Sequence, residues 1–291
     1  MIPSTFEYHS PTSLDEAISL LGSLGDDAKL LAGGHSLIPL MKLRLAAPAH
    51  LVDLGRVPNL SYIREDGGYI AIGALTTHST VADSELLLRR CAVVAEAAAS
   101  IGDVQVRNRG TIGGSLAHAD PGADQPGVAL ALNAVLVARG PKGTRTIAAS
   151  EFFTELLTTA LAADEVLTEI RIPALPARTG STYLKMANQA SGYALVGISA
   201  VVTLGGGGSN VADVRVGISG VGETPSRATA TERALLGREA TPDNIKIAAQ
   251  QAGTGVVPLG DIHASAEFRT HLVRVYAERA LNAAVQRARA G

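Results

Sequence analysis

The 291-residue sequence has one cysteine, no tryptophan and only 3% aromatic residues. One cysteine cannot form a disulfide within the chain, and it cannot by itself hold a cysteine-ligated iron–sulfur cluster. A net charge of −2 provides no general basic surface, and few rings are present on which bases could stack. No apolar run approaches the about 18 residues of a membrane span, and the N-terminus lacks a signal-peptide pattern. The sequence therefore predicts a cytoplasmic protein with no nucleic-acid partner and no transmembrane segment.

Several common motifs are also missing. The chain has neither G-x-G-x-x-G nor a Gly-Lys dipeptide, which argues against a Rossmann or P-loop enzyme. It has no H-E-x-x-H, and His118 with Asp120 and Asp124 lacks the usual zinc-ligand spacing, so no metal site is predicted. Cys91 lies in an expected helix over residues 86–100, where we expect an inert buried thiol.

Two Gly-Gly turns lie far apart in the sequence. They are Ala32-Gly33-Gly34-His35-Ser36 and Thr111-Ile112-Gly113-Gly114-Ser115. The first follows an apolar run and precedes an expected helix over residues 36–45. Such a strand, turn and helix direct unpaired N–H groups and a helix dipole at phosphate. Glycine has no Cβ to hold a ligand away, so two such turns suit a diphosphate. Ordinary tight turns are the alternative interpretation.

The pattern of expected elements divides the chain into three units. Residues 1–55 form a small α/β unit that contains the first Gly-Gly turn. Residues 56–177 begin with a hairpin, contain the second turn, and end at a proline-marked connection over residues 173–176. Residues 178–291 begin with an antiparallel meander and end with three helices. The sequence therefore predicts an α+β fold.

Four motifs in order carry a resemblance to a known family. They are Ala32-Gly33-Gly34-His35-Ser36-Leu37; Arg107-Asn108 leading to Thr111-Ile112-Gly113-Gly114-Ser115, Asp120-Pro121 and Asp124; Tyr183-Leu184-Lys185-Met186; and Ser191-Gly192-Tyr193-Ala194. From residue 1 to about residue 285 the chain resembles the FAD-binding medium subunits of molybdenum hydroxylases, the xanthine dehydrogenase family. The branch it resembles most contains aerobic carbon monoxide dehydrogenase. The resemblance implies a two-domain FAD-binding fold of the vanillyl-alcohol-oxidase type, followed by a C-terminal domain of sheet and helices.

The resemblance also implies a set of cofactor-binding residues. The backbone of Ala32 to Ser36 and of Thr111 to Ser115 would hold the FAD diphosphate, in agreement with the argument from bare amides. Ser115 departs from the asparagine of many relatives, which puts only its side-chain role in doubt. The remaining assignments are Ile101 packing on the cofactor, Asp124 bonding its ribityl or ribose part, Thr168 contacting the ring region through its backbone, Lys185 near the isoalloxazine, and Tyr193 stacking on or closing over it. Without the resemblance, Lys185 is a surface lysine, Tyr193 a half-buried strand residue and Asp124 a helix N-cap.

The function implied is electron relay. Electrons taken from substrate at a molybdenum cofactor on a large subunit would pass through two [2Fe-2S] clusters on a small subunit to FAD on this chain. They would leave to an external acceptor, with a quinone favoured and NAD second. The implied assembly is a dimer of heterotrimers that partners could attach to the inner face of the membrane. The alternatives are the FAD subunit of a related heterocycle, aldehyde or xanthine dehydrogenase, a self-sufficient FAD oxidase, and a non-catalytic nucleotide-binding or scaffold protein.

Overall fold

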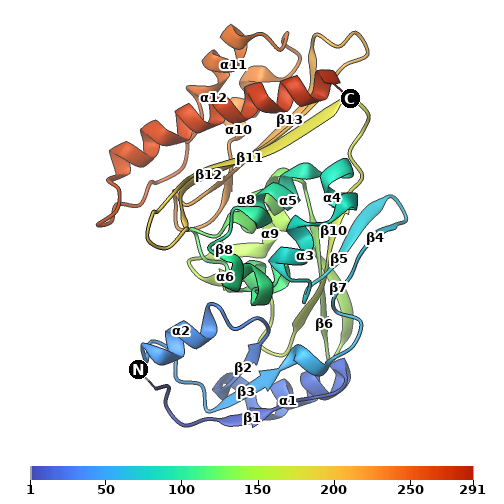
Figure 1. The fold of residues 1–291 in the computed structure, drawn as a ribbon, viewed down its shortest axis with the longest axis vertical. Helices are drawn as coiled ribbons and strands as arrows, with labels where there is room; N and C mark the ends of the chain where they lie inside the picture. The colour runs from blue at the N-terminus through green and yellow to red at the C-terminus, as the bar shows by residue number, and fades with distance from the viewer. Residues whose placement is uncertain (1, 291) are drawn as a thin grey trace.

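The computed structural model describes residues 2–290, in which three larger sheets follow one another along the chain (Figure 1). The first is parallel, with strand order β1-β3-β2. Its elements are β1 (Glu7–His9), α1 (Leu14–Leu24), η1 (Gly25–Asp27), β2 (Ala28–Leu31), α2 (Leu37–Lys42), β3 (His50–Asp53) and η2 (Leu54–Arg56). Helix α1 begins where Ser13 Oγ accepts from the Glu16 amide, and its buried side chains pack on β3. The helix expected over residues 36–45 is shorter and ends at Lys42.

The second sheet is antiparallel, with order β4-β5-β10-β6-β7. Its strands are β4 (Ile63–Asp66), β5 (Tyr69–Gly73), β6 (Val135–Gly140), β7 (Gly143–Ala148) and β10 (Val166–Pro173). A small two-stranded sheet, β8 (Phe153–Glu155) with β9 (Thr158–Thr159), lies beside it. The hairpin expected at the start of this unit is confirmed, since β4 and β5 pair around Gly67 and Gly68, which both have positive φ.

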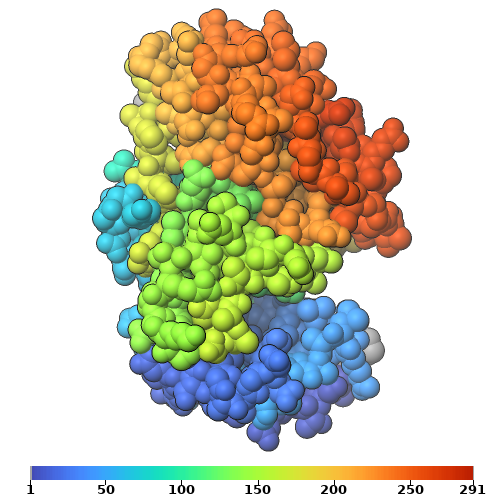
Figure 2. Space-filling model, turned by 180° about the vertical axis from the view of Figure 1, so that it is seen from behind, coloured from blue at the N-terminus to red at the C-terminus, as the bar shows by residue number. Residues whose placement is uncertain are grey.

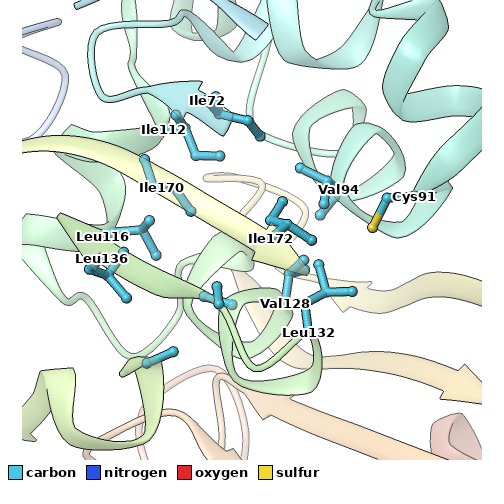
Figure 3. Packing of buried hydrophobic residues seen from close by; sticks show 14 of the residues in the cluster. Ile72, Cys91, Val94, Ile112, Leu116, Val128, Leu132, Leu136, Ile170 and Ile172 are labelled. Atoms are coloured by element: carbon cyan, nitrogen blue, oxygen red, sulfur yellow. The ribbon is translucent and has the colours of Figure 1, made fainter. Parts of the chain in front are cut away.

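Seven short helices accompany this sheet in the described chain. They are α3 (His78–Ala82), α4 (Glu85–Arg90), α5 (Ala92–Ala99), α6 (Val104–Arg109), α7 (Ile112–His118), α8 (Asp124–Ala131) and α9 (Ala149–Phe152). The prediction of a single helix over residues 86–100 is wrong. Cys91 has φ −159° and ψ 62°, which are not helical, and it separates α4 from α5. Figure 3 shows Cys91 and Val94 beside Ile172, Val128 and Leu132, in the core that α5, α8 and β10 share. Burial raises the pKa of the Cys91 thiol to about 12, as an inert thiol requires.

The third sheet is the expected antiparallel meander, with order β11-β12-β13-β14. Its elements are β11 (Thr179–Ala187), β12 (Ala194–Leu204), β13 (Val211–Ser219), β14 (Ser226–Arg227), α10 (Thr229–Leu235), α11 (Pro242–Ala249) and α12 (Ala266–Ala290). Helix α12 runs along β11 and β12 (Figure 1) and buries its small and branched side chains against them. None of the helices within residues 2–290 has the length and apolarity that a membrane crossing needs.

Candidate functional site

A cleft of about 480 Å³ lies where the N-terminal unit meets the rest of the molecule. Figure 2 shows a hollow between the blue N-terminal part and the green and yellow-green middle part, on the side where the cleft lies. Its walls include the turn between β2 and α2, the start of α7, residues 159–167 and the turn at residues 191–193. Apolar side chains such as Leu21, Leu54 and Leu161 line it, together with charged ones such as Asp26, Lys29 and Glu165. The cleft therefore offers both polar and apolar surface to a ligand.

The first glycine turn presents bare amides to this cleft. It connects β2, which ends at Leu31, with α2, which begins at Leu37, as predicted. Within residues 2–290, the amides of Gly33, Gly34, His35 and Ser36 have no protein acceptor, and all four residues line the cleft. Gly34 has a φ of +79°, which few other residues adopt without strain. This turn therefore has the donors that an anion needs.

The second glycine turn differs from the prediction, because the amides from Ile112 to Ser115 are occupied. The Ile112 amide donates to Thr76 O at 3.0 Å and the Gly113 amide to Ala74 O at 2.9 Å. The Gly114 amide donates to the N-cap oxygen Thr111 Oγ1 at 3.1 Å. The turn is itself the first turn of α7, held against the segment that follows β5. The residues of this turn that line the cleft are Thr111, Gly113, Gly114 and Ser115. The Ser115 amide donates to Thr111 O within the helix.

Two of the glycines allow close backbone contacts: Gly33 lies against the segment that precedes the second turn, and Gly113 lies against the segment that follows β5. A Cβ on Gly33 would overlap the carbonyl oxygen of Arg109 and lie 2.7 Å from the Cα of Gly110. A Cβ on Gly113 would lie 2.5 Å from the Cβ of Ala74. The absence of a side chain at these positions therefore serves the approach of one backbone segment to another. The expectation that it clears space for a ligand is wrong for Gly33 and Gly113.

The structure gathers most of the predicted residues at the cleft. The predicted residues that line it are Ala32, Gly33, Gly34, His35, Ser36, Ile101, Thr111, Gly113, Gly114, Ser115, Asp124 and Tyr193. Ile101 is held in place by Arg107, whose Nη1 donates to the Ile101 carbonyl at 2.9 Å.

Three predicted residues do not line the cleft: Ile112, Thr168 and Lys185. The Ile112 side chain lies in the core beside Ile72 and Ile170 (Figure 3). The Thr168 carbonyl accepts from the Ala74 amide at 2.9 Å, and its hydroxyl donates to Val137 O, so both groups have partners within the protein. These positions follow from nonlocal strand pairing, which the sequence pattern did not reveal.

Lys185 forms a buried ion pair with Asp124. Its Nζ lies 3.0 Å from Asp124 Oδ2 and donates to the Gly192 carbonyl at 2.7 Å, while Tyr183 Oη donates to Asp124 Oδ1. The two charged side chains are 8% and 5% exposed, so Lys185 is not a surface lysine. Burial raises the pKa of Asp124, and the Lys185 ammonium opposes that shift. Asp124 is the first residue of α8 and Ala123 is its N-cap, so the expected capping role of Asp124 is wrong.

Tyr193 comes to the cleft from the C-terminal unit. It lies in the turn before β12, one residue outside the strand in which we expected it, and 43% of it is exposed. Burial and the nearby Asp120 raise the pKa of its phenol, while the Ser36 hydroxyl lowers it. Tyr193 and Ser36 both line the cleft. The site is therefore composed of segments from both ends of the chain.

His78 is a cleft residue that the sequence analysis missed. It lies in the first turn of α3 and is 4% exposed, and its Nδ1 has no hydrogen-bond partner within residues 2–290. Burial, together with the nearby His35, lowers its pKa from 6.5 to about 4. No local motif marks it, because its burial depends on the approach of Gly110 from the other side.

Two family models match consecutive parts of the chain. The family model described as "FAD binding domain in molybdopterin dehydrogenase" matches residues 4–175, and that of the "CO dehydrogenase flavoprotein C-terminal domain" matches residues 181–284. The chain therefore belongs to the family of FAD-binding subunits of molybdopterin dehydrogenases, which are oxidoreductases.

Individual relatives cover the whole chain. The carbon monoxide dehydrogenase medium chain of Hydrogenophaga pseudoflava is 43% identical over 284 residues, which is 98% of each chain. The 6-hydroxypseudooxynicotine dehydrogenase complex subunit alpha of Paenarthrobacter nicotinovorans is 38% identical and covers 99% of this chain and 97% of its own. A solved structure of the Hydrogenophaga pseudoflava carbon monoxide dehydrogenase superposes with a TM-score of 0.95 at 45% identity, covering 99% of both chains.

Proposed function

We propose that this chain is the electron-transfer subunit of a molybdenum hydroxylase of the carbon monoxide dehydrogenase type, with its FAD held in the cleft. The observation that carries the proposal is the row of bare amides from Gly33 to Ser36 on the cleft wall. These donors fit a diphosphate, and the leucine side chains of the cleft lining fit a flat ring. The relationship to carbon monoxide dehydrogenase medium chains supports the same assignment.

The residues of this chain would bind and orient the cofactor. The first turn would donate hydrogen bonds to the diphosphate, and the Ser115 hydroxyl would supplement it from the second turn. Asp124 keeps acceptor capacity beyond its bonds to Tyr183 and Lys185, since a carboxylate offers about four lone-pair sites, and could accept from a sugar hydroxyl. Tyr193 would limit water access at the mouth. FAD supplies the ability to take electrons singly and to release them in pairs.

The route of electrons is part of the same proposal. The single cysteine is buried and inert, so the [2Fe-2S] clusters belong on a small partner subunit, and the molybdenum cofactor on a large one. The proposed assembly is a dimer of heterotrimers. We propose a quinone as the external acceptor, with NAD as second choice.

Retention of FAD tests the site. Gly33→Ala puts a methyl group into the Arg109 carbonyl, so the first turn must move away from residues 109–110. We expect the FAD affinity of the purified full-length chain to fall by more than about 10-fold. The matched control is Gly22→Ala in α1, where the added methyl group meets open space. Far-UV circular dichroism confirms that both variants are folded. Unchanged FAD retention in Gly33→Ala contradicts the proposed cradle.

The assembled complex tests the reaction. Purified with its large and small subunits, it should oxidise carbon monoxide and reduce a quinone analogue faster than NAD. Oxidation of a nitrogen heterocycle in place of carbon monoxide favours the second candidate, the FAD subunit of a heterocycle dehydrogenase, which the likeness to the Paenarthrobacter nicotinovorans subunit supports. Flavin reduction by a substrate without any partner subunit contradicts both and points to a self-sufficient oxidase.

A further inference from the structure

Two histidines and a glutamate meet at the outer edge of the N-terminal sheet. Glu7 and His9 lie two residues apart on β1 and therefore on the same face of the sheet. Strand β1 pairs with β3 so that Glu7 is opposite His50. Tyr8, between the first two, lies on the other face and donates to Asp53. None of the three residues lines the cleft, so this cluster is separate from the proposed flavin site.

The distances within the cluster suit a coordinated ion. His9 Nε2 lies 3.2 Å from His50 Nδ1, and His50 Nδ1 lies 3.4 Å from Glu7 Oε2. All three candidate ligand atoms lie within 4.8 Å of one another. Bonds of about 2.0–2.1 Å to a tetrahedral zinc ion place its ligand atoms about 3.3 Å apart. The His9–His50 and His50–Glu7 distances therefore already match the spacing of ligand atoms around a tetrahedral zinc ion.

Ligand chemistry and access narrow the choice of ion. Two imidazoles and one carboxylate are typical of Zn²⁺ and related transition metals, whereas Mg²⁺ and Ca²⁺ prefer sites composed only of oxygen. The Glu7 side chain is 74% exposed and that of His50 22%, so an ion can enter from solvent and keep a water molecule as its fourth ligand. No thiol is involved, since Cys91 is buried in the core of the middle unit.

We propose that Glu7, His9 and His50 bind one Zn²⁺ ion that fastens β1 to β3. Strand β1 has only three residues and lies at the edge of its sheet, so backbone pairing alone holds it weakly. An ion that bridges Glu7 and His9 to His50 cross-links the two strands through side chains. Because the ion binds the folded arrangement in preference to the unfolded chain, it stabilises this lobe.

The test uses the full-length chain without a histidine tag, stripped with a chelator and titrated with ZnCl₂ in a calorimeter. We expect one saturable site per chain and a zinc-dependent rise in the midpoint of thermal unfolding. Co²⁺ should give the visible absorption bands of a four-coordinate nitrogen and oxygen site. His9→Ala and Glu7→Gln should each weaken Zn²⁺ binding by more than about 10-fold. The matched control is His271→Ala on the exposed side of α12, which should bind Zn²⁺ as the unaltered chain does.

Folding is controlled within the same experiment. In chelator, both ligand variants should unfold near the midpoint of the unaltered chain, and they should lose only the zinc-dependent rise. FAD retention should be equal in all of these proteins, which separates this proposal from that of the flavin site. A stoichiometry well below one, or a rise in the midpoint that persists in both ligand variants, overturns the proposal.

Discussion

Acid should destabilise this protein through His78, a buried imidazole in the first turn of α3. Its pKa is about 4 in the folded chain, against 6.5 for an ordinary histidine. Between these two values the unfolded chain binds a proton at this site and the folded chain does not. The contribution of His78 to the free energy of unfolding is therefore complete above pH 6.5, decreases as the pH falls, and is fully lost near pH 4.

The size of the effect follows from the shift. At about 1.36 kcal/mol per pKa unit, the full loss is about 3 kcal/mol, of which about 2 kcal/mol is lost by pH 5. This is a large fraction of the about 5–15 kcal/mol that holds a typical domain folded.

The assay is urea unfolding of the FAD-free chain at pH 7.5 and at pH 5, for the unaltered protein and for His78→Gln. Far-UV circular dichroism is the suitable signal because the chain has no tryptophan. Other groups titrate in both proteins and cancel in the difference. The unaltered protein should lose about 2 kcal/mol more than the variant between the two pH values. An equal loss in both proteins refutes the assignment of a neutral, desolvated imidazole.

Three further predictions concern packing and buried charge. Gly180→Ala drives a methyl group into the Ala284 carbonyl under α12, so urea unfolding should show a loss of about 1–3 kcal/mol, and an unchanged midpoint would contradict this close contact. Lys185→Met leaves Asp124 buried without its cation and should cost about 3–5 kcal/mol, whereas the double variant with Asp124→Asn should recover most of it; additive losses would show that the pair is not coupled. Gly22→Ala in α1 should stabilise the chain by up to about 1 kcal/mol in the same assay, and a loss would show that this turn of the helix is not regular.

The sequence was sufficient to predict those elements whose structure depends on residues close together in the chain. The first glycine turn, α1 and the meander of β11 to β13 were predicted because propensity, capping and alternation act within a few residues. The second glycine turn looked the same in sequence. The amides of Ile112 and Gly113 donate to Thr76 and Ala74, which lie far back along the chain, so no local pattern indicated the difference.

Side chains that act across units were the hardest to predict. Lys185 alternates like a surface residue of β11, yet it is buried because Asp124 on α8 packs against it. His50 and His9 carry no motif, since parallel pairing of β1 with β3 alone brings them together. The break between α4 and α5 at Cys91 likewise could not be predicted, because no glycine or proline lies near it in the sequence.

The turn at residues 191–193 belongs to the C-terminal unit, yet it closes one wall of the cleft. A fragment that ended after β10 would keep both glycine turns and the bare amides but would lack Tyr193 and the Lys185 bond to Gly192. Residues 4–175, which match the FAD-binding family model, therefore form only part of the cleft. A cofactor bound in the cleft would contact both the N-terminal and the C-terminal unit, and its loss would weaken the contact between these two units.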